Sequence, residues 1–128
     1  MPAYNFQKQF APLVESGQKR QTIRSIGKRR HARPGESLQL YTGQRTRVCR
    51  KLLSPDPECV SVQNVYMLKI IERRRDSHAY QLYLDGKLVF WDEVSEIAGA
   101  DGFENSTAFF NFFEDAYGMP FCGILIKW

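Results

Sequence analysis

Hydrophobic and polar residues alternate along much of the middle of the chain, which is the pattern of strands with one buried face. In the segment PGESLQLYTG, Leu38 and Leu40 alternate with Gln39 and Tyr41 after a Pro-Gly turn. The runs CVSVQNVYMLKII (59–71) and FCGILIKW (121–128) predict a long strand and a final strand, and TIRS (22–25) and TRVCRKLL (46–53) predict shorter ones. In YQLYLDGKLVF (80–90), Asp-Gly between two alternating runs predicts a β-hairpin.

Apolar residues at helical spacing predict three helices. The segment FAPLVESG (10–17) predicts a short helix that ends at Gly17, because glycine favours the left-handed conformation of a C-cap. The segment WDEVSEIA (91–98) predicts a helix whose buried face contains Trp91, Val94, Ile97 and Ala98. The segment STAFFNFFEDAYG (106–118) predicts a helix with Ser106 as its N-cap and Gly118 past its end. Its core-facing stripe contains Phe109, Phe110, Phe113 and Tyr117.

The order of these elements predicts an α+β fold around a small, strongly bent antiparallel sheet or barrel. A chain of 128 residues is about one domain's worth, so we expect a single domain over residues 1–128. No apolar run is long enough to span a membrane and MPAYNFQKQF lacks a signal-peptide pattern, which predicts a cytoplasmic protein with no membrane partner. Three cysteines without C-x-x-C spacing and two isolated histidines indicate no disulfide framework and no metal site, and no cofactor is expected.

The net charge of +4 conceals two regions of opposite sign. Between Lys19 and Lys51, eleven lysines and arginines accompany a single acid, Glu36. Between Asp76 and Asp115, nine acids accompany a single lysine, Lys87. The basic region predicts an anionic partner, for which nucleic acid or a nucleotide is the simplest candidate. The alternative is that the opposite charges merely face each other across the fold and keep the surface soluble.

Four segments, taken in order, resemble the ASCH domain, the activating-signal-cointegrator homology family. They are LVESGQKRQTIR (13–24), PGESLQLYTG (34–43), GADGFENSTAFFNFFEDAYG (99–118) and FCGILIKW (121–128), and they contain a Gly-x-Lys-x-x-Thr-x-Arg pattern, a Pro-Gly-Glu strand opening and an Asp-Gly-Phe loop. The resemblance covers nearly the whole chain. It implies a PUA-like antiparallel β-barrel of about five to six strands with flanking helices, a cleft between barrel and helices, and an RNA-binding or coactivator-associated role.

One bacterial branch of that family consists of acetylcytidine amidohydrolases, which remove the acyl group from the exocyclic amine of a modified cytidine. The resemblance to this branch assigns its catalytic lysine to Lys19, its threonine to Thr22 and its acid to Asp101. The enzymes have Glu where this chain has Asp, which is one methylene shorter and weakens the catalytic hypothesis. If the alignment is displaced there, the carboxylate is supplied by a nearby glutamate: Glu93, Glu96 or Glu104.

Hydrolysis of an amide needs a nucleophile, a base and donors for the oxyanion. Thr22 would be the nucleophile or would orient a water, and Asp101 would orient the lysine or protonate the leaving amine. Lys19 would act as the base only if burial or the neighbouring Arg20 and Arg24 lower its pKa. Side chains alternate along a strand, so the chain must turn around residues 19–21 if Lys19 and Thr22 are to meet.

The sequence therefore leaves two hypotheses. We favour an RNA- or nucleic-acid-binding domain with a cleft around Lys19, Thr22, Arg24 and Asp101, with hydrolysis left open as a further activity. The alternative is a small amidohydrolase that acts on a modified cytidine nucleoside, or a nuclease that uses the same cleft. The expected contacts to nucleic acid are basic side chains and one aromatic ring: Arg20, Arg24, Lys28, Arg29, Arg30, Arg45, Arg47 and Tyr41. Trp91 is a second candidate for stacking on a base, and both rings suit a barrel wall equally well.

Overall fold

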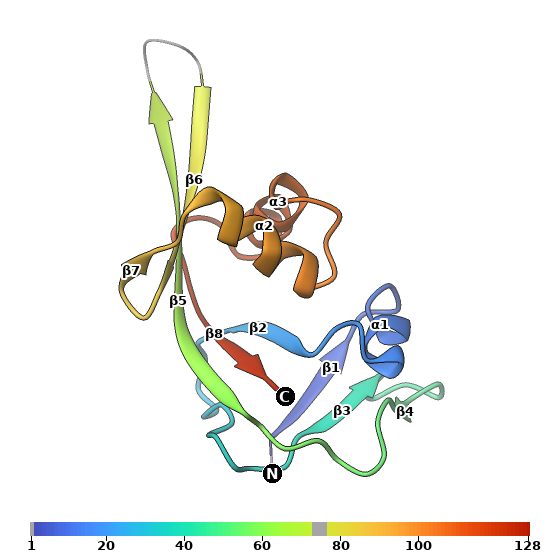
Figure 1. The fold of residues 1–128 in the computed structure, drawn as a ribbon. Helices are drawn as coiled ribbons and strands as arrows, with labels where there is room; N and C mark the ends of the chain where they lie inside the picture. Colours follow the sequence, from blue (N-terminus) through green and yellow to red (C-terminus); the bar gives the residue numbers. More distant parts are fainter. Residues whose placement is uncertain (1, 73–76) are drawn as a thin grey trace.

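The computed structural model describes residues 2–72 and 77–128 (Figure 1). Its helices are α1 (Ala11–Ser16), α2 (Trp91–Ala100) and α3 (Ser106–Tyr117). Its strands are β1 (Ala3–Phe6), β2 (Gln21–Ser25), β3 (Gln39–Thr42), β4 (Arg50–Lys51), β5 (Ser61–Glu72), β6 (Ser77–Leu84), β7 (Lys87–Leu88) and β8 (Phe121–Lys127). The α+β class is confirmed. Eight strands are described where five to six were expected, and within the described ranges they form two sheets with no closed barrel.

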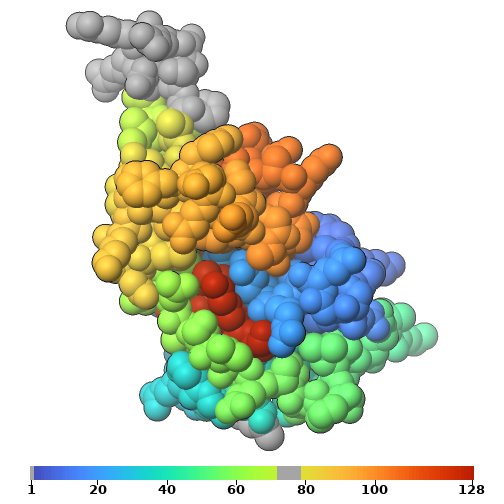
Figure 2. Space-filling view, viewed as in Figure 1, coloured from blue at the N-terminus to red at the C-terminus, as the bar shows by residue number. Residues whose placement is uncertain are grey.

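The larger sheet has five antiparallel strands in the order β2-β8-β5-β6-β7. The predicted final strand, β8, lies inside this sheet, where Ile126 pairs with Thr22 on one side and with Val62 on the other. In the space-filling view the red C-terminal end of the chain lies between the green β5 and the blue β2 (Figure 2). A Cβ atom on Gly123 would lie 2.6 Å from the carbonyl oxygen of Arg24, so this glycine permits the close approach of β8 to β2.

The smaller sheet has the order β1-β3-β4 and contains the two departures from the predicted strands. Strand β1 was not predicted, and it runs parallel to β3. The predicted strand over residues 46–53 is wrong except at Arg50–Lys51, because residues 43–48 form a turn. Arg45 adopts a left-handed conformation there, with a φ of 65°, and Thr46 donates from both its amide and its hydroxyl to the carbonyl of Gly43.

The predicted hairpin is confirmed. Asp85 and Gly86 have φ angles of 50° and 81°, which is the double left-handed geometry of a tight two-residue turn between β6 and β7. The hairpin of β5 and β6 extends past α2 and α3, which lie together on one side of the larger sheet (Figure 1).

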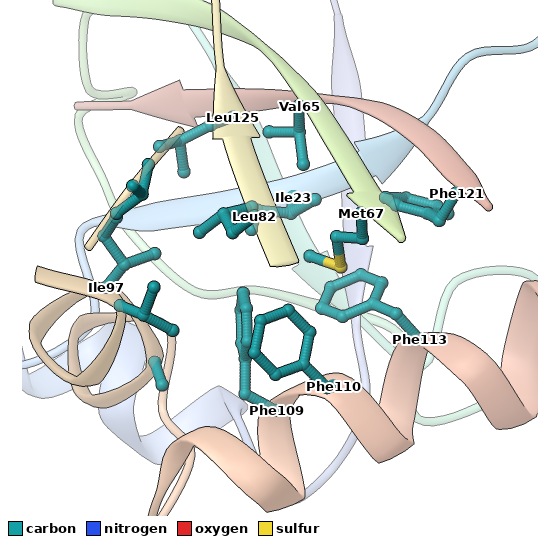
Figure 3. Packing of buried hydrophobic residues seen from close by; sticks show 13 residues of the cluster. Ile23, Val65, Met67, Leu82, Ile97, Phe109, Phe110, Phe113, Phe121 and Leu125 are labelled. Carbon is teal, nitrogen blue, oxygen red and sulfur yellow. The ribbon is translucent and has the colours of Figure 1, made fainter. Parts of the chain in front are cut away.

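The aromatic stripe of α3 packs on that sheet, as predicted. Phe109, Phe110 and Phe113 point toward Met67 and Leu82 (Figure 3). Within β8, Leu125 belongs to this core, whereas its neighbour Ile126 belongs to a second core formed with α1, β1 and β3. Because adjacent side chains of a strand point to opposite faces, β8 lies between the two cores and contributes a buried side chain to each.

Three side chains at helix ends differ from the prediction. Trp91, the first residue of α2, is 74% exposed and lines a surface pocket instead of the core. Tyr117, the last residue of α3, is 54% exposed and lines two cavities. The N-cap of α3 is Asn105 and not Ser106, because Asn105 has an extended backbone and its side chain accepts from the Ala108 amide at 2.8 Å. No helix in the part of the chain that the structure describes is long and apolar enough to cross a membrane.

Candidate functional site

The end of α1 directs Lys19 into the molecule. Gly17 has a φ of 84° and caps the helix, and the amide of Lys19 then donates to the carbonyl of Leu13 at 2.9 Å. This arrangement buries Lys19 to 3% exposure before the chain enters β2. The predicted short helix with a glycine cap is thus confirmed, and it positions the first residue of the site.

Lys19 forms a buried ion pair with Asp101, the residue that ends α2. The Lys19 Nζ lies 3.0 Å from Asp101 Oδ1 and also donates to the Asp101 backbone carbonyl. That carbonyl belongs to the last turn of the helix, where a cation is favoured by the helix dipole. The ammonium also lies 5.1 Å from the ring centroid of Phe10 and 5.9 Å from that of Phe6. Lys19 therefore has a structural role in capping α2 as well as a place in the site.

Gln21 supports the carboxylate and was missed by the sequence analysis. Its side-chain amide is buried and donates to Asp101 Oδ1 and to the carbonyl of Ile97, each at 3.4 Å. A glutamine that opens a strand carries no signal in the sequence that distinguishes it from a solvent-facing polar residue. Gln21 holds Asp101 in the orientation that faces Lys19.

Burial changes the pKa of both partners in opposite directions. Desolvation lowers the pKa of Lys19, and the charge and hydrogen bond of Asp101 partly offset that effect. Desolvation raises the pKa of Asp101, and Lys19 and then Gln21 oppose the rise. The two shifts bring the proton affinities of amine and carboxylate closer together than they are in water.

Thr22 and Arg24 lie on one face of β2 and contact each other. The Arg24 Nε donates to Thr22 Oγ1 at 2.9 Å, and Thr22 is buried. The Arg24 guanidinium lies 4.8 Å from the ring centroid of Phe6 and 5.3 Å from that of Tyr4. Burial lowers the pKa of Arg24, but arginine remains charged at neutral pH.

Lys19, Thr22, Arg24 and Asp101 line one cavity of about 280 Å³. We call it the Lys19 cavity. Its walls are largely aromatic: Phe6, Phe10, Phe103, Phe112, Phe113 and Tyr117. The bend after Gly17 thus brings Lys19 and Thr22 to the same space, as their proposed cooperation requires. The alternative carboxylates Glu93, Glu96 and Glu104 are exposed and do not line it.

A second cavity of about 580 Å³ adjoins the first, since Arg24 and Tyr117 line both. We call it the Arg29 cavity. Arg29, Arg30 and His31 contribute to it from the basic loop after β2. Arg30 is held by Glu36, with Nη1 to Oε1 at 2.7 Å and Nη2 to Oε2 at 2.6 Å. The pKa of Glu36 falls to about 2 mainly because of this hydrogen bonding with Arg30.

The remaining predicted contacts lie outside both cavities. Lys28, Arg45 and Arg47 are exposed, and Arg20 is exposed with its Nε 3.2 Å from the Trp128 backbone oxygen. Tyr41 is half-buried in β3 and lines neither cavity. Trp91 lines a separate apolar pocket of about 500 Å³ with Phe90 and Leu88. The structure therefore gathers only part of the predicted contacts around the Lys19 cavity.

Among the described residues, few ion pairs join the basic and acidic regions. In the described ranges, which exclude Asp76, one ion pair joins them, that of Lys19 with Asp101. Arg50 and Lys51 pair instead with carboxylates outside the acidic region, those of Glu15 and Asp56. Ten of the eleven basic side chains between Lys19 and Lys51 therefore have no ion-pair partner among the described carboxylates of the acidic region.

Comparisons with protein-family models, with curated proteins and with solved structures found no match. Residues 2–72 and 77–128 contain no group of three or more His, Cys, Asp or Glu side chains able to hold a metal ion.

Proposed function

We propose that this protein is an RNA-binding ASCH domain of the PUA-like superfamily, and that the Lys19 cavity receives one base of a single-stranded nucleic acid. The observation that carries the proposal is the convergence of Lys19, Thr22, Arg24 and Asp101 in an aromatic-walled cavity beside a basic loop. The family assignment depends on the order of the four sequence motifs, and the α+β architecture is compatible with it.

The chemistry of the cavity suits a nucleobase. Its volume of about 280 Å³ lies at the lower end of the range for small-molecule sites, which suits a single base or nucleoside and not several nucleotides. Aromatic side chains offer faces for stacking, which is the usual way in which proteins hold an unstacked base. The hydroxyl of Thr22, the guanidinium of Arg24 and the carboxylate of Asp101 supply donors and acceptors for a base edge.

Basic side chains without ion-pair partners in the described ranges, inside and outside the two cavities, suit a phosphate backbone. Arg24, Lys28, Arg29, Arg45 and Arg47 have no ion-pair partner among the described carboxylates. Cations of this kind attract nucleic acid because their contacts release counterions, so the affinity falls as salt rises.

The test is fluorescence anisotropy with a labelled single-stranded RNA over a series of KCl concentrations. With about three phosphate contacts, we expect log affinity to fall against log salt with a slope of about −2. The Lys28→Ala variant should reduce the steepness of the slope by about 0.7. Lys87→Ala, on β7 and outside the basic region, changes a residue that lines neither cavity and should leave the slope unchanged. Absence of RNA binding, or equal effects of the two substitutions, would overturn the proposal.

A second candidate, amide hydrolysis, is favoured by the presence of Lys19, Thr22 and Asp101 in one cavity. Thr22 Oγ1 accepts a hydrogen bond from Arg24, which leaves the hydroxyl proton for a base and would stabilise a developing alkoxide. Burial lowers the pKa of Lys19, which favours the unprotonated amine that a general base requires.

Chromatography of acetylcytidine incubated with the purified protein tests this activity. Turnover by the wild type that is lost in both Lys19→Met and Thr22→Val, with circular dichroism unchanged, would support hydrolysis. No turnover by the wild type, or turnover retained in both variants, would contradict it.

A further inference from the structure

The guanidinium of Arg24 lies where the two cavities meet, and one of its five N–H donors has a partner among the described residues. Its Nε donates to Thr22, and the rings of Tyr4 and Phe6 lie against it. Its two Nη groups have no hydrogen-bond acceptor among the described residues. The donors that remain form the fork with which arginine binds phosphate or carboxylate.

His31 fixes the basic loop beside the place where the two cavities meet, and both of its ring nitrogens are hydrogen-bonded. Its Nε2 lies 2.8 Å from the carbonyl of Ser25, so Nε2 carries the proton and donates. Its Nδ1 then accepts from the Tyr4 hydroxyl at 3.2 Å, while that hydroxyl oxygen accepts from the Ala32 amide at 3.0 Å. The two rings stack, with centroids 5.9 Å apart and planes 14° apart. His31 is thus a positioning residue for the loop that carries Arg29.

The charge of the Arg29 cavity comes from two arginines. Both Nη groups of Arg30 donate to the carboxylate of Glu36, so the charges of these two residues compensate each other. None of the described acidic residues lines the Arg29 cavity, and Asp101, the carboxylate of the Lys19 cavity, is already paired with Lys19. Arg24 and Arg29 are therefore the uncompensated charges of the joined space.

We infer, as a consequence of the proposed function, that the two cavities form one nucleotide site. The base lies in the Lys19 cavity, and the phosphate of the same nucleotide lies between Arg24 and Arg29. The ligand class is accordingly a nucleotide, free or within a single strand, and not an uncharged nucleoside. A phosphate is the group that matches two guanidinium forks lining one cavity without a competing described carboxylate.

Isothermal titration calorimetry with the four ribonucleosides and their 5′-monophosphates tests the inference. For the base that binds best, the monophosphate should bind about tenfold to a hundredfold more tightly than the nucleoside. Arg29→Ala should lower that ratio several-fold, because only the Arg24 fork then remains for the phosphate. Arg33→Ala removes the same charge four residues away, from an exposed side chain that lines neither cavity, and should preserve the ratio.

Equal affinities of the wild type for nucleoside and monophosphate would overturn the inference. So would equal losses in Arg29→Ala and Arg33→Ala, because the preference would then reflect the overall charge of the loop. Binding of single-stranded RNA without binding of any monophosphate would also overturn it, while the proposed function would stand. Failure of RNA, nucleosides and monophosphates alike would contradict the proposed function itself.

Discussion

The buried pair of Lys19 and Asp101 predicts that removing one partner costs more stability than removing both. Each residue is 3% exposed, and the ammonium lies beside the rings of Phe6 and Phe10. Asp101→Asn leaves the ammonium in these surroundings without a counter-charge, which should lower the free energy of unfolding by about 3–5 kcal/mol. Lys19→Met leaves the carboxylate unpaired and should have a cost of similar size.

The double variant Lys19→Met with Asp101→Asn buries neither charge. It loses the charge-assisted hydrogen bond from the Lys19 ammonium to the Asp101 carbonyl, which is worth about 1.5–3 kcal/mol. Methionine retains most of the packing of the lysine stem. The double variant should therefore be about 2 kcal/mol more stable than either single variant.

The two single variants should respond to pH with opposite signs. In Lys19→Met, Asp101 loses the partner that opposes its raised pKa, so the folded state retains a proton that the unfolded state releases. Its stability should fall as pH rises above the unfolded value of 3.8, by at most about 1.4 kcal/mol per pH unit. In Asp101→Asn, the pKa of Lys19 falls further, the folded state binds fewer protons, and stability should rise with pH up to the unfolded value of 10.5.

Urea denaturation followed by circular dichroism, at about pH 5, 7 and 9, measures all three variants against the wild type. An unchanged m-value would show that the comparison concerns stability alone. The reasoning would be refuted if the double variant lost the sum of the two single costs, or if the single variants changed with pH in the same direction.

Three further predictions concern the framework of the site. Gly123→Ala should lower the free energy of unfolding by about 1–3 kcal/mol, because the new Cβ would lie 2.6 Å from the Arg24 carbonyl oxygen. Gly99→Ala, at an open position of α2, should raise it by about 0.5–1 kcal/mol in the same denaturation assay. Asn105→Ala should cost about 1 kcal/mol by loss of the α3 cap, and Asn105→Asp should restore most of it; equal losses would exclude the capping role. NMR titration should give Glu36 a pKa of about 2, and Arg30→Ala should raise that pKa. Because the pKa is depressed in the folded state, the stability that this pair contributes is lost as pH falls from 4.5 toward 2. An unchanged Glu36 pKa in Arg30→Ala would contradict the pairing.

Local patterns in the sequence predicted the elements that are stabilised locally or by one buried face. The alternation of Leu38 and Leu40 with polar neighbours identified β3, and Asp85-Gly86 identified the hairpin. Strand β1 has four residues, too few to show a period, and it is stabilised by parallel pairing with β3, which lies over thirty residues later. The predicted strand at residues 46–53 is wrong around Val48, which lies in a turn and is 67% exposed.

The candidate site was partly accessible from the sequence. The Gly-x-Lys-x-x-Thr-x-Arg motif singled out Lys19, Thr22 and Arg24, and the Asp-Gly-Phe loop singled out Asp101. Tyr117 was assigned to the core because it continues the aromatic stripe of α3, and only the three-dimensional structure shows that it bounds both cavities. Gln21 was missed for the same kind of reason: its contacts are with residues 76 and 80 positions away.

Photo-cross-linking tests the central claim most directly, because it locates the base itself. A single-stranded RNA that carries one 4-thiouridine is irradiated with the protein, and the cross-linked peptide is mapped by mass spectrometry. We expect the cross-link in the walls of the Lys19 cavity, within residues 5–10 or 103–117, and its loss in Arg24→Gln. Cross-links confined to the turn that carries Arg45 and Arg47, or to the pocket of Phe90 and Trp91, would contradict the account.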